Sequence, residues 1–444
     1  MTNWDKFVIE LNGIEIITEP ERITKLSLDY YHFSPVLQPK LEDKRGDLVV
    51  LPSNEEEVIQ IAKTCVKYRV PLTIRGAGTG NYGQCVPLQG GVILDTTKMN
   101  KIISLKQGVA WVEPGVRLAK FDQQARETGW ELRMYPSTYR TATIGGFIGG
   151  GSGGIGSINY GGLSDHGNIL ALKVVTLEEE PRLLELQGEE VQQVNHAYGT
   201  NGIITQLKIP LAKTYPWAEV IATFNKFMDA AKFGQALADA DGLIKKLISI
   251  HACPIPSYFI PLQSYLPQGK HCALLMVAES CLGPLQSLVA EYEGQITYQR
   301  SSAEAKKGTS LAEFTWNHTT LHSRSVDNNL TYLQSVFPYD PQLKLVEHMY
   351  KYFGEEVMMH LEFMRSRGRA VAGGLQIVRY TTEERLQEII AYHEAQGVFI
   401  ANPHTYILED GGRKTIDNQQ LEFKKLADPF GLLNPGKMRS FKLN

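Results

Sequence analysis

The sequence has few cysteines, no long apolar run and no excess of charge of one sign. Its 444 residues include five cysteines, none in a CxxC pair, which argues against a disulfide framework and a cysteine zinc site, so we expect buried thiols. The longest apolar stretch, near Ala273 to Ala278, is far too short to span a bilayer. The 45 Lys and Arg against 48 Asp and Glu leave a net charge of −3, which does not indicate a nucleic-acid partner.

Two further patterns are missing. No basic region followed by an apolar one is visible near the N-terminus, so we expect no secretory signal and a cytoplasmic protein. No GxxxxGK[ST] occurs anywhere in the sequence, which excludes a Walker phosphate loop.

The pattern of apolar residues changes near residue 216, which predicts two domains. Before it, short strand-like runs alternate with helical patterns, and the first of these helices is expected to begin at a capping-box signature, Ser53 to Glu56. After it, longer helical patterns are separated by short strand-like runs. The expected strands include 48–52, 71–75, 92–95, 109–113, 170–177, 273–278 and 370–380, and the expected helices include 116–128, 224–238, 344–353 and 381–397.

Glycine is what the sequence has in excess, and the excess is local. Many of the 40 glycines lie in a first glycine segment, residues 75–84, and a second glycine segment, residues 145–167. Both match GxGxxG, at Gly78, Gly80 and Gly83 and at Gly151, Gly153 and Gly156. A Rossmann dinucleotide site needs such glycines to run from a strand directly into a helix. Neither segment is followed by a helical pattern, so we interpret neither as a Rossmann fingerprint.

Both segments are still suited to binding a cofactor. After the strand-like run 71–75, glycines let consecutive backbone N–H groups converge on an anion, as a pyrophosphate requires. The alternative is a tight turn with a solvated Arg75. The second segment carries so much glycine that its conformational entropy is hard to offset unless a large, flat group lies against the backbone.

At these residues the sequence resembles flavoproteins of the vanillyl-alcohol oxidase type, whose FAD-binding fold is also called PCMH-type. It is most similar to the branch that contains the glycolate oxidase large subunit, D-lactate dehydrogenase and D-2-hydroxyacid dehydrogenase. The resemblance rests on residues 71–80, 90–95 and 99–100, on 135–137, 143–146 and 153–165, on 199–205, and on 428–437.

The resemblance implies an α+β fold. It implies a PCMH-type FAD-binding domain of two α/β subdomains over residues 1–215, to which the C-terminal tail 411–444 returns, and an α+β cap with an antiparallel sheet over residues 216–410. Families with covalent flavin place His in the first glycine loop, where this chain has Gly78-Thr79, so non-covalent FAD is expected. The residues implied to bind FAD are Arg75, Gly76, Ala77, Gly78, Thr79, Gly80, Asn81, Pro136, Ser137, Thr143, Gly145, Gly146, Ser152, Gly153, Gly154, Ile158, Gly202, Ile203, Ile204 and Asn434.

Oxidation of an alcohol by a flavin needs a base for the hydroxyl proton, and a 2-hydroxy acid also needs a cation for its carboxylate. His318 and His322 stand four residues apart, where they could share a metal or straddle the flavin. His404 and Glu409 lie in a segment that resembles one near the family's active site, and His360 is a further base candidate. We name His318, His322, His360, His404, Glu409 and Arg324 as candidate catalytic residues, with Arg365, Arg367, Arg369 and Arg379 as other candidate cations.

The sequence therefore predicts an FAD-dependent oxidoreductase that oxidises a small 2-hydroxy acid, such as glycolate or D-lactate, by hydride transfer to flavin N5. The HxGDGNxH-like metal segment of the D-lactate branch is absent, so no metal site is assigned. For the same reason, oxidation of a sugar, polyol or other alcohol stays open. A flavin-binding electron-transfer subunit without its own substrate is a third hypothesis. The implied partners are a small-molecule substrate, an unknown electron acceptor and a second copy in a homodimer.

Overall fold

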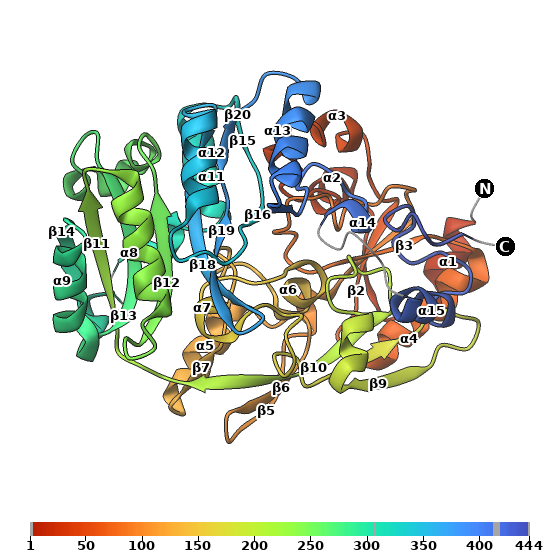
Figure 1. Ribbon diagram of the computed structural model, residues 1–444. Coiled ribbons are helices and arrows are strands. Elements are labelled where there is room, and N and C mark those ends of the chain that lie inside the picture. The colour runs from red at the N-terminus through yellow and green to blue at the C-terminus, as the bar shows by residue number, and fades with distance from the viewer. Residues whose placement is uncertain (1–2, 306–307, 412–417, 443–444) are drawn as a thin grey trace.

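The computed structural model describes residues 3–305, 308–411 and 418–442. The chain forms two lobes, one built from its N-terminal half and its C-terminal end and the other from its middle (Figure 1). Among the described residues, no helix is long and apolar enough to cross a membrane. The five cysteines are free thiols, of which Cys65, Cys272 and Cys281 are buried and Cys85 and Cys253 are half-buried.

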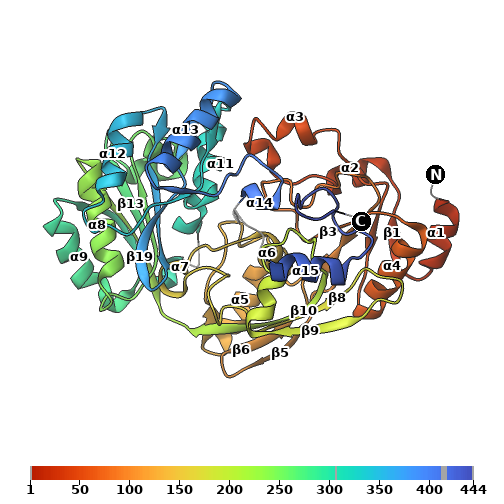
Figure 2. The ribbon, with the colours of Figure 1, turned by 45° about the vertical axis from the view of Figure 1, so that its right-hand side comes forward.

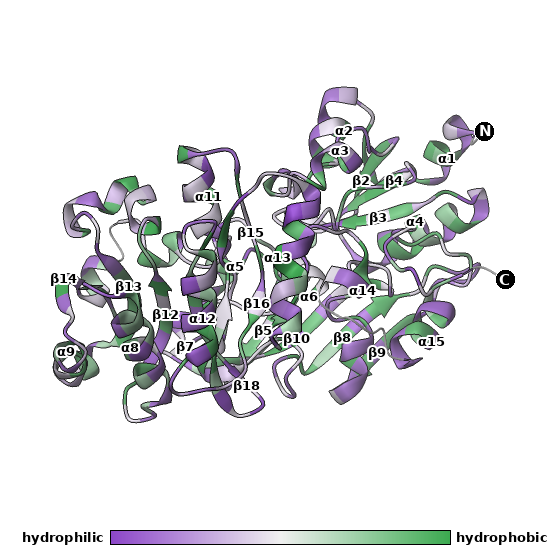
Figure 3. Cartoon of the chain, turned by 45° about the horizontal axis from the view of Figure 1, so that its top comes forward, coloured by the Kyte–Doolittle hydropathy of each residue, from purple (hydrophilic) through white to green (hydrophobic). Residues whose placement is uncertain are grey.

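The first lobe begins with a four-stranded sheet in the order β1-β2-β4-β3. Strands β2, β4 and β3 are parallel, and they are hydrophobic along their length because both faces are covered (Figure 3). The elements of this part are α1 (Trp4–Glu10), β1 (Glu15–Ile17), α2 (Pro20–Leu26), η1 (Tyr31–Phe33), α3 (Gln38–Leu41), β2 (Leu48–Leu51), α4 (Glu55–Tyr68), β3 (Leu72–Arg75), β4 (Val92–Asp95) and η2 (Thr96–Lys98).

A second, antiparallel sheet completes this lobe in the order β5-β6-β10-β8-β9, with β7 also paired to β10. The first glycine segment follows β3, whereas the second glycine segment contains two short helices between β7 and β8. The elements are β5 (Ile102–Lys106), β6 (Val109–Val112), α5 (Leu118–Glu127), β7 (Trp130–Leu132), α6 (Ile144–Gly150), α7 (Ser157–Tyr160), β8 (Ala171–Val175), β9 (Leu183–Gln187), η3 (Gly188–Gln193) and β10 (Ile203–Lys213).

The other lobe is a large antiparallel sheet in the order β14-β11-β13-β12-β18-β19-β16-β21, with a small sheet β15-β20-β17 beside it. Its strands are β11 (Trp217–Phe224), β12 (Lys245–His251), β13 (His271–Ala278), β14 (Gln295–Arg300), β15 (Leu330–Tyr332), β16 (Ser335–Val336), β17 (Val357–Met358), β18 (His360–Ser366), β19 (Arg369–Gly374), β20 (Ile377–Arg379) and β21 (Phe399–Ile400). Its helical elements are α8 (Phe227–Asp239), η4 (Ile255–Tyr258), η5 (Ile260–Tyr265), η6 (Glu279–Cys281), α9 (Leu282–Glu291), α10 (Ser302–Ala305), η7 (Leu311–Phe314), α11 (Asn317–Val326), α12 (Lys344–Phe353) and α13 (Glu383–Ala395).

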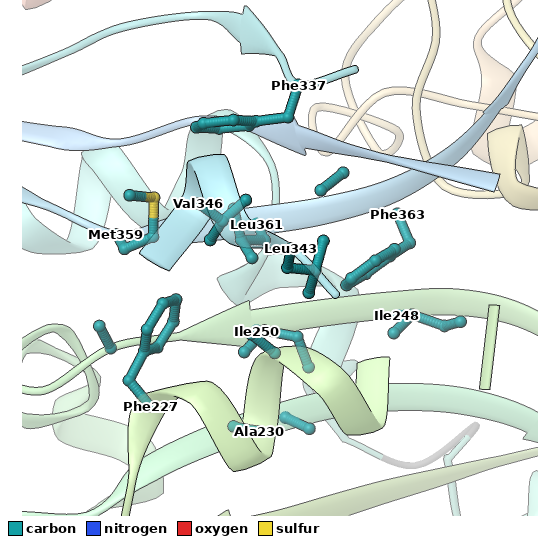
Figure 4. Packing of buried hydrophobic residues seen from close by; sticks show 14 of the residues in the cluster. Phe227, Ala230, Ile248, Ile250, Phe337, Leu343, Val346, Met359, Leu361 and Phe363 are labelled. Carbon is teal, nitrogen blue, oxygen red and sulfur yellow. The ribbon is translucent and has the colours of Figure 1, made fainter. Parts of the chain in front are cut away.

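The core of this second lobe explains which side chains remain for a site. Leu361 and Phe363 of β18 pack with residues of β12, α8 and α12 on one face of the sheet (Figure 4). Because side chains alternate along a strand, His360, Glu362 and Met364 of β18 point to the opposite face. That face looks toward the glycine-rich segments, since Glu362 and Met364 line the same cavity as residues of both segments.

The C-terminal end returns to the first lobe, where α14 (Leu408–Gly411) and α15 (Asn418–Ala427) lie in both Figure 1 and Figure 2. The Leu72 N–H donates to Leu432 O, and the Asn434 N–H donates to Leu72 O, both at 2.8 Å. The tail therefore runs parallel to β3, next to the first glycine segment.

Most of the predicted strands and helices are confirmed within a few residues, and α12 has the predicted bounds. The start of α4 differs by one residue: Asn54 caps the helix by accepting from the Glu57 N–H, whereas Ser53 bonds the Glu57 carboxylate. Helix α6 was not expected, because its sequence IGGFIGG has low intrinsic helix propensity. Its N-cap Thr143 and its packing in the core stabilise it instead.

Candidate active site

A cavity of about 730 Å³ lies where the two glycine segments face the second lobe. Its size is typical of a site for a cofactor or small molecule. Residues 76–82 and 145–153 contribute much of its wall from the first lobe. The second lobe contributes, among others, Trp316, Asn317, His318, Gln334, Glu362, Arg365 and Arg367.

The first glycine segment presents a row of unused hydrogen-bond donors. The backbone N–H groups of residues 76–81 have no acceptor in the described part of the chain. Gly78 has a φ of +64°, in the left-handed region, and a Cβ there would lie 2.1 Å from Arg75 Nη2. A run of N–H groups without acceptors in a glycine-rich loop is suited to binding an anion.

Arg75 does not line the cavity; its side chain stabilises the first glycine segment by hydrogen bonds to backbone carbonyl groups. Its guanidinium donates to Leu28 O at 2.5 Å and to Ala77 O at 3.4 Å. Below it, Asp29 and Lys437 are buried, and Lys437 Nζ donates to Gly83 O. Burial raises the pKa of Asp29 to about 6 and lowers the pKa of Lys437 to about 8. The C-terminal tail thus holds the first glycine segment in place.

The second glycine segment leaves open space along α6. An added Cβ on Gly149 would meet nothing within 4 Å, and Gly149 lines the cavity. Elsewhere the segment packs closely, since a Cβ on Gly154 would lie 2.1 Å from Tyr135 O. The absence of side chains therefore keeps one wall flat at Gly149 and allows close backbone packing at Gly154.

The structure places most residues expected to bind FAD on the cavity wall. These are Gly76, Ala77, Gly78, Thr79, Gly80, Asn81, Pro136, Ser137, Thr143, Gly145, Gly146, Ser152, Gly153, Gly202 and Ile204. Five others do not line it: Arg75, Gly154, Ile158, Ile203 and Asn434. Ile158 and Ile203 are core residues, and the Asn434 amide donates to Gln84 O and Tyr198 O, so it fixes the loop instead of facing the cavity.

Of the six candidate catalytic residues, the structure brings only His318 to the cavity wall. His322 donates to Glu313 O at 3.0 Å and stacks on Phe314, and burial lowers its pKa. The guanidinium of Arg324 donates to Leu330 O.

Glu409 also lies away from the cavity, because its carboxylate accepts the backbone N–H groups of Arg439 and Ser440 in the tail. The polar groups of His322, Arg324 and Glu409 are therefore used within the protein, and none of the three faces the cavity. In the described part of the chain no group of three or more His, Cys, Asp or Glu side chains could hold a metal ion.

His404 is a buried structural residue. Its Nε2–H donates to Tyr332 O at 2.9 Å, and its Nδ1 accepts from the Ser34 hydroxyl at 2.8 Å. Burial lowers its pKa from 6.5 to about 4, so it is neutral near pH 7. His404 does not line the cavity.

This burial predicts a pH effect on stability. Between about pH 6.5 and the lowered pKa of about 4, the unfolded chain binds a proton at His404 that the folded protein does not. Stability at this residue is therefore lost as pH falls, by about 3 kcal/mol at the lower limit. Urea unfolding at about pH 7 and about pH 4.5 should show a smaller loss in His404→Gln than in the wild type. His166→Gln, at an exposed histidine, is the control and should keep the wild-type loss.

Within the described ranges, two carboxylates line the cavity: Asp165, which accepts from the Gly162 N–H at 2.7 Å, and Glu362, which was not predicted. On neighbouring strands β12 and β18, Ser249 stands opposite Glu362 and His251 opposite His360. With Thr319 these four side chains form a buried polar cluster, in which none is more than 1% exposed. Alternating polar residues in Ser249-Ile-His251 and His360-Leu-Glu362 were a sequence signal for this cluster.

One oxygen of Glu362 is fully used, and the other is available. Glu362 Oε1 accepts from the Ser249 hydroxyl and from the backbone N–H of Trp316, both at 2.7 Å. It also lies 2.8 Å from His360 Nε2. Glu362 Oε2 has no hydrogen-bond partner among the described residues. Trp316 has φ 52° and ψ −138°, a rare conformation for a residue with a side chain. Such strain persists where the surroundings impose it, as they do at functional sites.

His360 and Glu362 are in direct contact within the cluster, through His360 Nε2 and Glu362 Oε1. His360 Nδ1 must donate to Leu375 O, since a carbonyl only accepts. Its Nε2 can then donate to Glu362 only as an imidazolium, or accept from a protonated Glu362. His251 stacks on His360 at 4.4 Å, and burial lowers its pKa well below the ordinary value. His251 is therefore neutral near pH 7.

Two arginines of the β18–β19 hairpin line the cavity. Arg365 is engaged with Ile158 O, Gly368 O and the Asp241 carboxylate. Arg367 is exposed and has no ion-pair or hydrogen-bond partner among the described residues. It is an available cation on the cavity wall.

Sequence comparison links the first lobe to known proteins. Residues 46–181 match the family described as FAD binding domain. The chain is 30% identical over 245 residues to glycolate oxidase subunit GlcD of Escherichia coli, covering 52% of this chain and 46% of that protein. It is 30% identical over 196 residues to a D-lactate dehydrogenase of Archaeoglobus fulgidus, covering 41% and 43% of the two chains. The chain thus spans under half the length of these curated relatives.

Solved structures share the fold over nearly the whole chain. An alkyldihydroxyacetonephosphate synthase superposes with a TM-score of 0.73 at 15% identity, covering 98% of this chain and 85% of that one. A 4-ethylphenol oxidase from Gulosibacter chungangensis gives a TM-score of 0.68 at 15% identity, covering 98% and 96%. At this identity the likeness concerns the fold alone.

Proposed function

Since the chain carries an FAD-binding domain of PCMH type, we propose that it is an FAD-dependent oxidoreductase that oxidises a small 2-hydroxy acid of the glycolate or D-lactate type. The single observation that carries the proposal is Glu362, a buried carboxylate with one unused oxygen, on the wall of the glycine-lined cavity. Bound FAD would supply the hydride acceptor. We also propose residues 1–215 and 411–444 as the FAD domain and residues 216–410 as the cap.

The residues present fit FAD. The unpaired N–H groups of residues 76–81 provide donors for a pyrophosphate. The wall at Gly149 admits a flat group, because no side chain projects there. Thr79 offers no histidine for a covalent bond at the position where related families have one, which supports non-covalent FAD.

Glu362 would act as the base for the substrate hydroxyl. As a carboxylate, Glu362 could accept the hydroxyl proton at Oε2, because Oε1 is already occupied by His360 Nε2, the Ser249 hydroxyl and the Trp316 backbone N–H. The Trp316 N–H and the Ser249 hydroxyl hold the carboxylate in one orientation throughout. His318, the predicted residue on the same wall, lies 3.4 Å from the Glu313 carboxylate and would stay beside the substrate as a polar neighbour.

Arg367 would bind the substrate carboxylate. We predict that Arg367→Ser raises the KM for a 2-hydroxy acid by about 10-fold to 100-fold, because it removes a charged hydrogen-bond donor. Steady-state kinetics with D-lactate and glycolate measure this effect. Arg369→Ser is the matched control, since Arg369 lies on the same hairpin but outside the cavity wall and contacts Tyr339. Equal changes of KM in both variants would contradict the assignment.

Anaerobic bleaching of the flavin tests the proposed function. The purified protein should be yellow, and gentle denaturation should release its FAD. Glycolate and D-lactate should reduce the flavin, whereas reduction only by polyols or aromatic alcohols would favour the alternative alcohol substrates. No reduction by any class would favour an electron-transfer subunit. The electron acceptor, a homodimer and a cytoplasmic location stay predictions from the sequence.

A further inference from the structure

Three large apolar side chains stand exposed around the same cavity. Tyr30 is 44% exposed, Leu321 is 40% exposed and Phe399 is 41% exposed, and all three line the cavity wall. We call them the apolar rim. Single exposed apolar residues are ordinary, but three on the wall of one cavity offer apolar surface to a ligand bound there.

The rim is assembled from three distant parts of the chain. Tyr30 precedes η1 and is fixed by its N–H, which donates to Gly80 O of the first glycine segment at 2.8 Å. Leu321 lies on α11 one turn after Asn317 and His318, which also line the cavity. Phe399 of β21 stands directly opposite Val336 of β16, another cavity residue. Tertiary contacts therefore bring three distant segments of the chain to the wall of one cavity.

The cavity wall is thus polar at Glu362 and apolar at the rim. Glu362 is buried within it, whereas the rim faces solvent. A ligand that satisfies both parts is amphiphilic, with a polar end inside and an apolar end on the rim. Glycolate has no apolar substituent, and that of lactate is a single methyl group.

We infer that the substrate is a 2-hydroxy acid with a sizeable alkyl or aryl substituent, which the apolar rim binds. This inference rests on the proposed function for the identity of the polar end. The substituent would leave water against Tyr30, Leu321 and Phe399. Each methylene that is fully buried should strengthen binding by about fourfold.

Chain-length dependence tests the inference. In the reductive half-reaction of the holoenzyme, the second-order rate constant for flavin reduction should rise from glycolate through 2-hydroxybutanoate to 2-hydroxyoctanoate, by about twofold to fourfold per methylene. The double variant Leu321→Ser/Phe399→Ser should lose most of the octanoate-to-glycolate ratio. Val326→Ser is the control, because Val326 is 52% exposed on the same helix but is not a cavity residue. It should keep the wild-type ratio.

Binding of unreactive acids separates this inference from the proposed function. The affinity of butanoate, hexanoate and octanoate for the oxidised holoenzyme, measured from the flavin spectrum or by calorimetry, should rise with length in the wild type and not in the double variant. If this trend holds while no 2-hydroxy acid reduces the flavin, the rim stands and the proposed reaction fails. Affinities independent of length would overturn the rim as a substrate site. The inference would also be overturned if the double variant changed only the rate of flavin reoxidation by a quinone, because the rim would then bind the electron acceptor and not the substrate.

Discussion

Replacing Glu362 by glutamine should slow flavin reduction by substrate by about 10²-fold to 10⁴-fold, the usual contribution of a positioned general base. Glutamine keeps the size of the side chain and an oxygen for the Trp316 N–H and the Ser249 hydroxyl, but it cannot accept the substrate proton. FAD should remain bound, because Glu362 lies on β18 and provides none of the N–H groups proposed to hold the pyrophosphate. Stopped-flow reduction under anaerobic conditions measures the rate.

Glu409→Gln is the matched control for this experiment. Glu409 is also a buried carboxylate, but it accepts two backbone N–H groups from the C-terminal tail and does not line the cavity. Its variant should reduce the flavin at the wild-type rate once folded. If Glu362→Gln reduced as fast as the wild type, the proton would have another acceptor, and His318, the predicted histidine on the cavity wall, would be tested next.

Placing a leucine at Gly149 should weaken FAD binding by about 10-fold to 100-fold, because the side chain would occupy the space meant for the cofactor. The apo-protein should tolerate the change, since a Cβ at this position meets no atom within 4 Å. Titration of apo-protein with FAD, followed by flavin fluorescence, gives the affinity. Thermal unfolding of the apo-protein should be close to that of the wild type.

Gly242→Leu is the control, because Gly242 is exposed, has open space and lies outside the cavity wall. Its FAD affinity should be unchanged. Gly78→Leu is a less discriminating variant, since its Cβ would collide with the Arg75 guanidinium at a positive φ and disturb the loop itself. Wild-type affinity in Gly149→Leu would show that FAD does not lie along α6.

Local sequence patterns predicted much of the fold. Strands such as β2, β3 and β4 follow from short apolar runs. Helix α12 follows from helical periodicity, and α13 follows from its threonine N-cap. The α+β fold with a PCMH-type FAD domain and an antiparallel second sheet is confirmed by the sheet order and by the likeness to solved structures. Helix α6 was missed, because local propensity disfavours it and only packing stabilises it.

The catalytic residues were harder to predict than the cofactor segments. His322, His404 and Glu409 are chemically suitable, yet their polar atoms are used in internal hydrogen bonds. Glu362 has no motif of its own, and its position depends on its pairing with Ser249 across two strands that are more than a hundred residues apart in sequence. Residue type alone could not distinguish a carboxylate that faces a cavity from one that anchors a tail.

The sequence by itself determined the FAD-binding character of the protein, because close approach of a cofactor to backbone N–H groups favours closely spaced glycines, and these are a local feature of the sequence. Only the tertiary structure decided which side chains face that cofactor's site. Glu362, Arg367 and the apolar rim come from two strands, a hairpin turn, a helix and a loop far apart in the chain. Their meeting depends on strand register and lobe packing, which are set by long-range burial and not by local pattern.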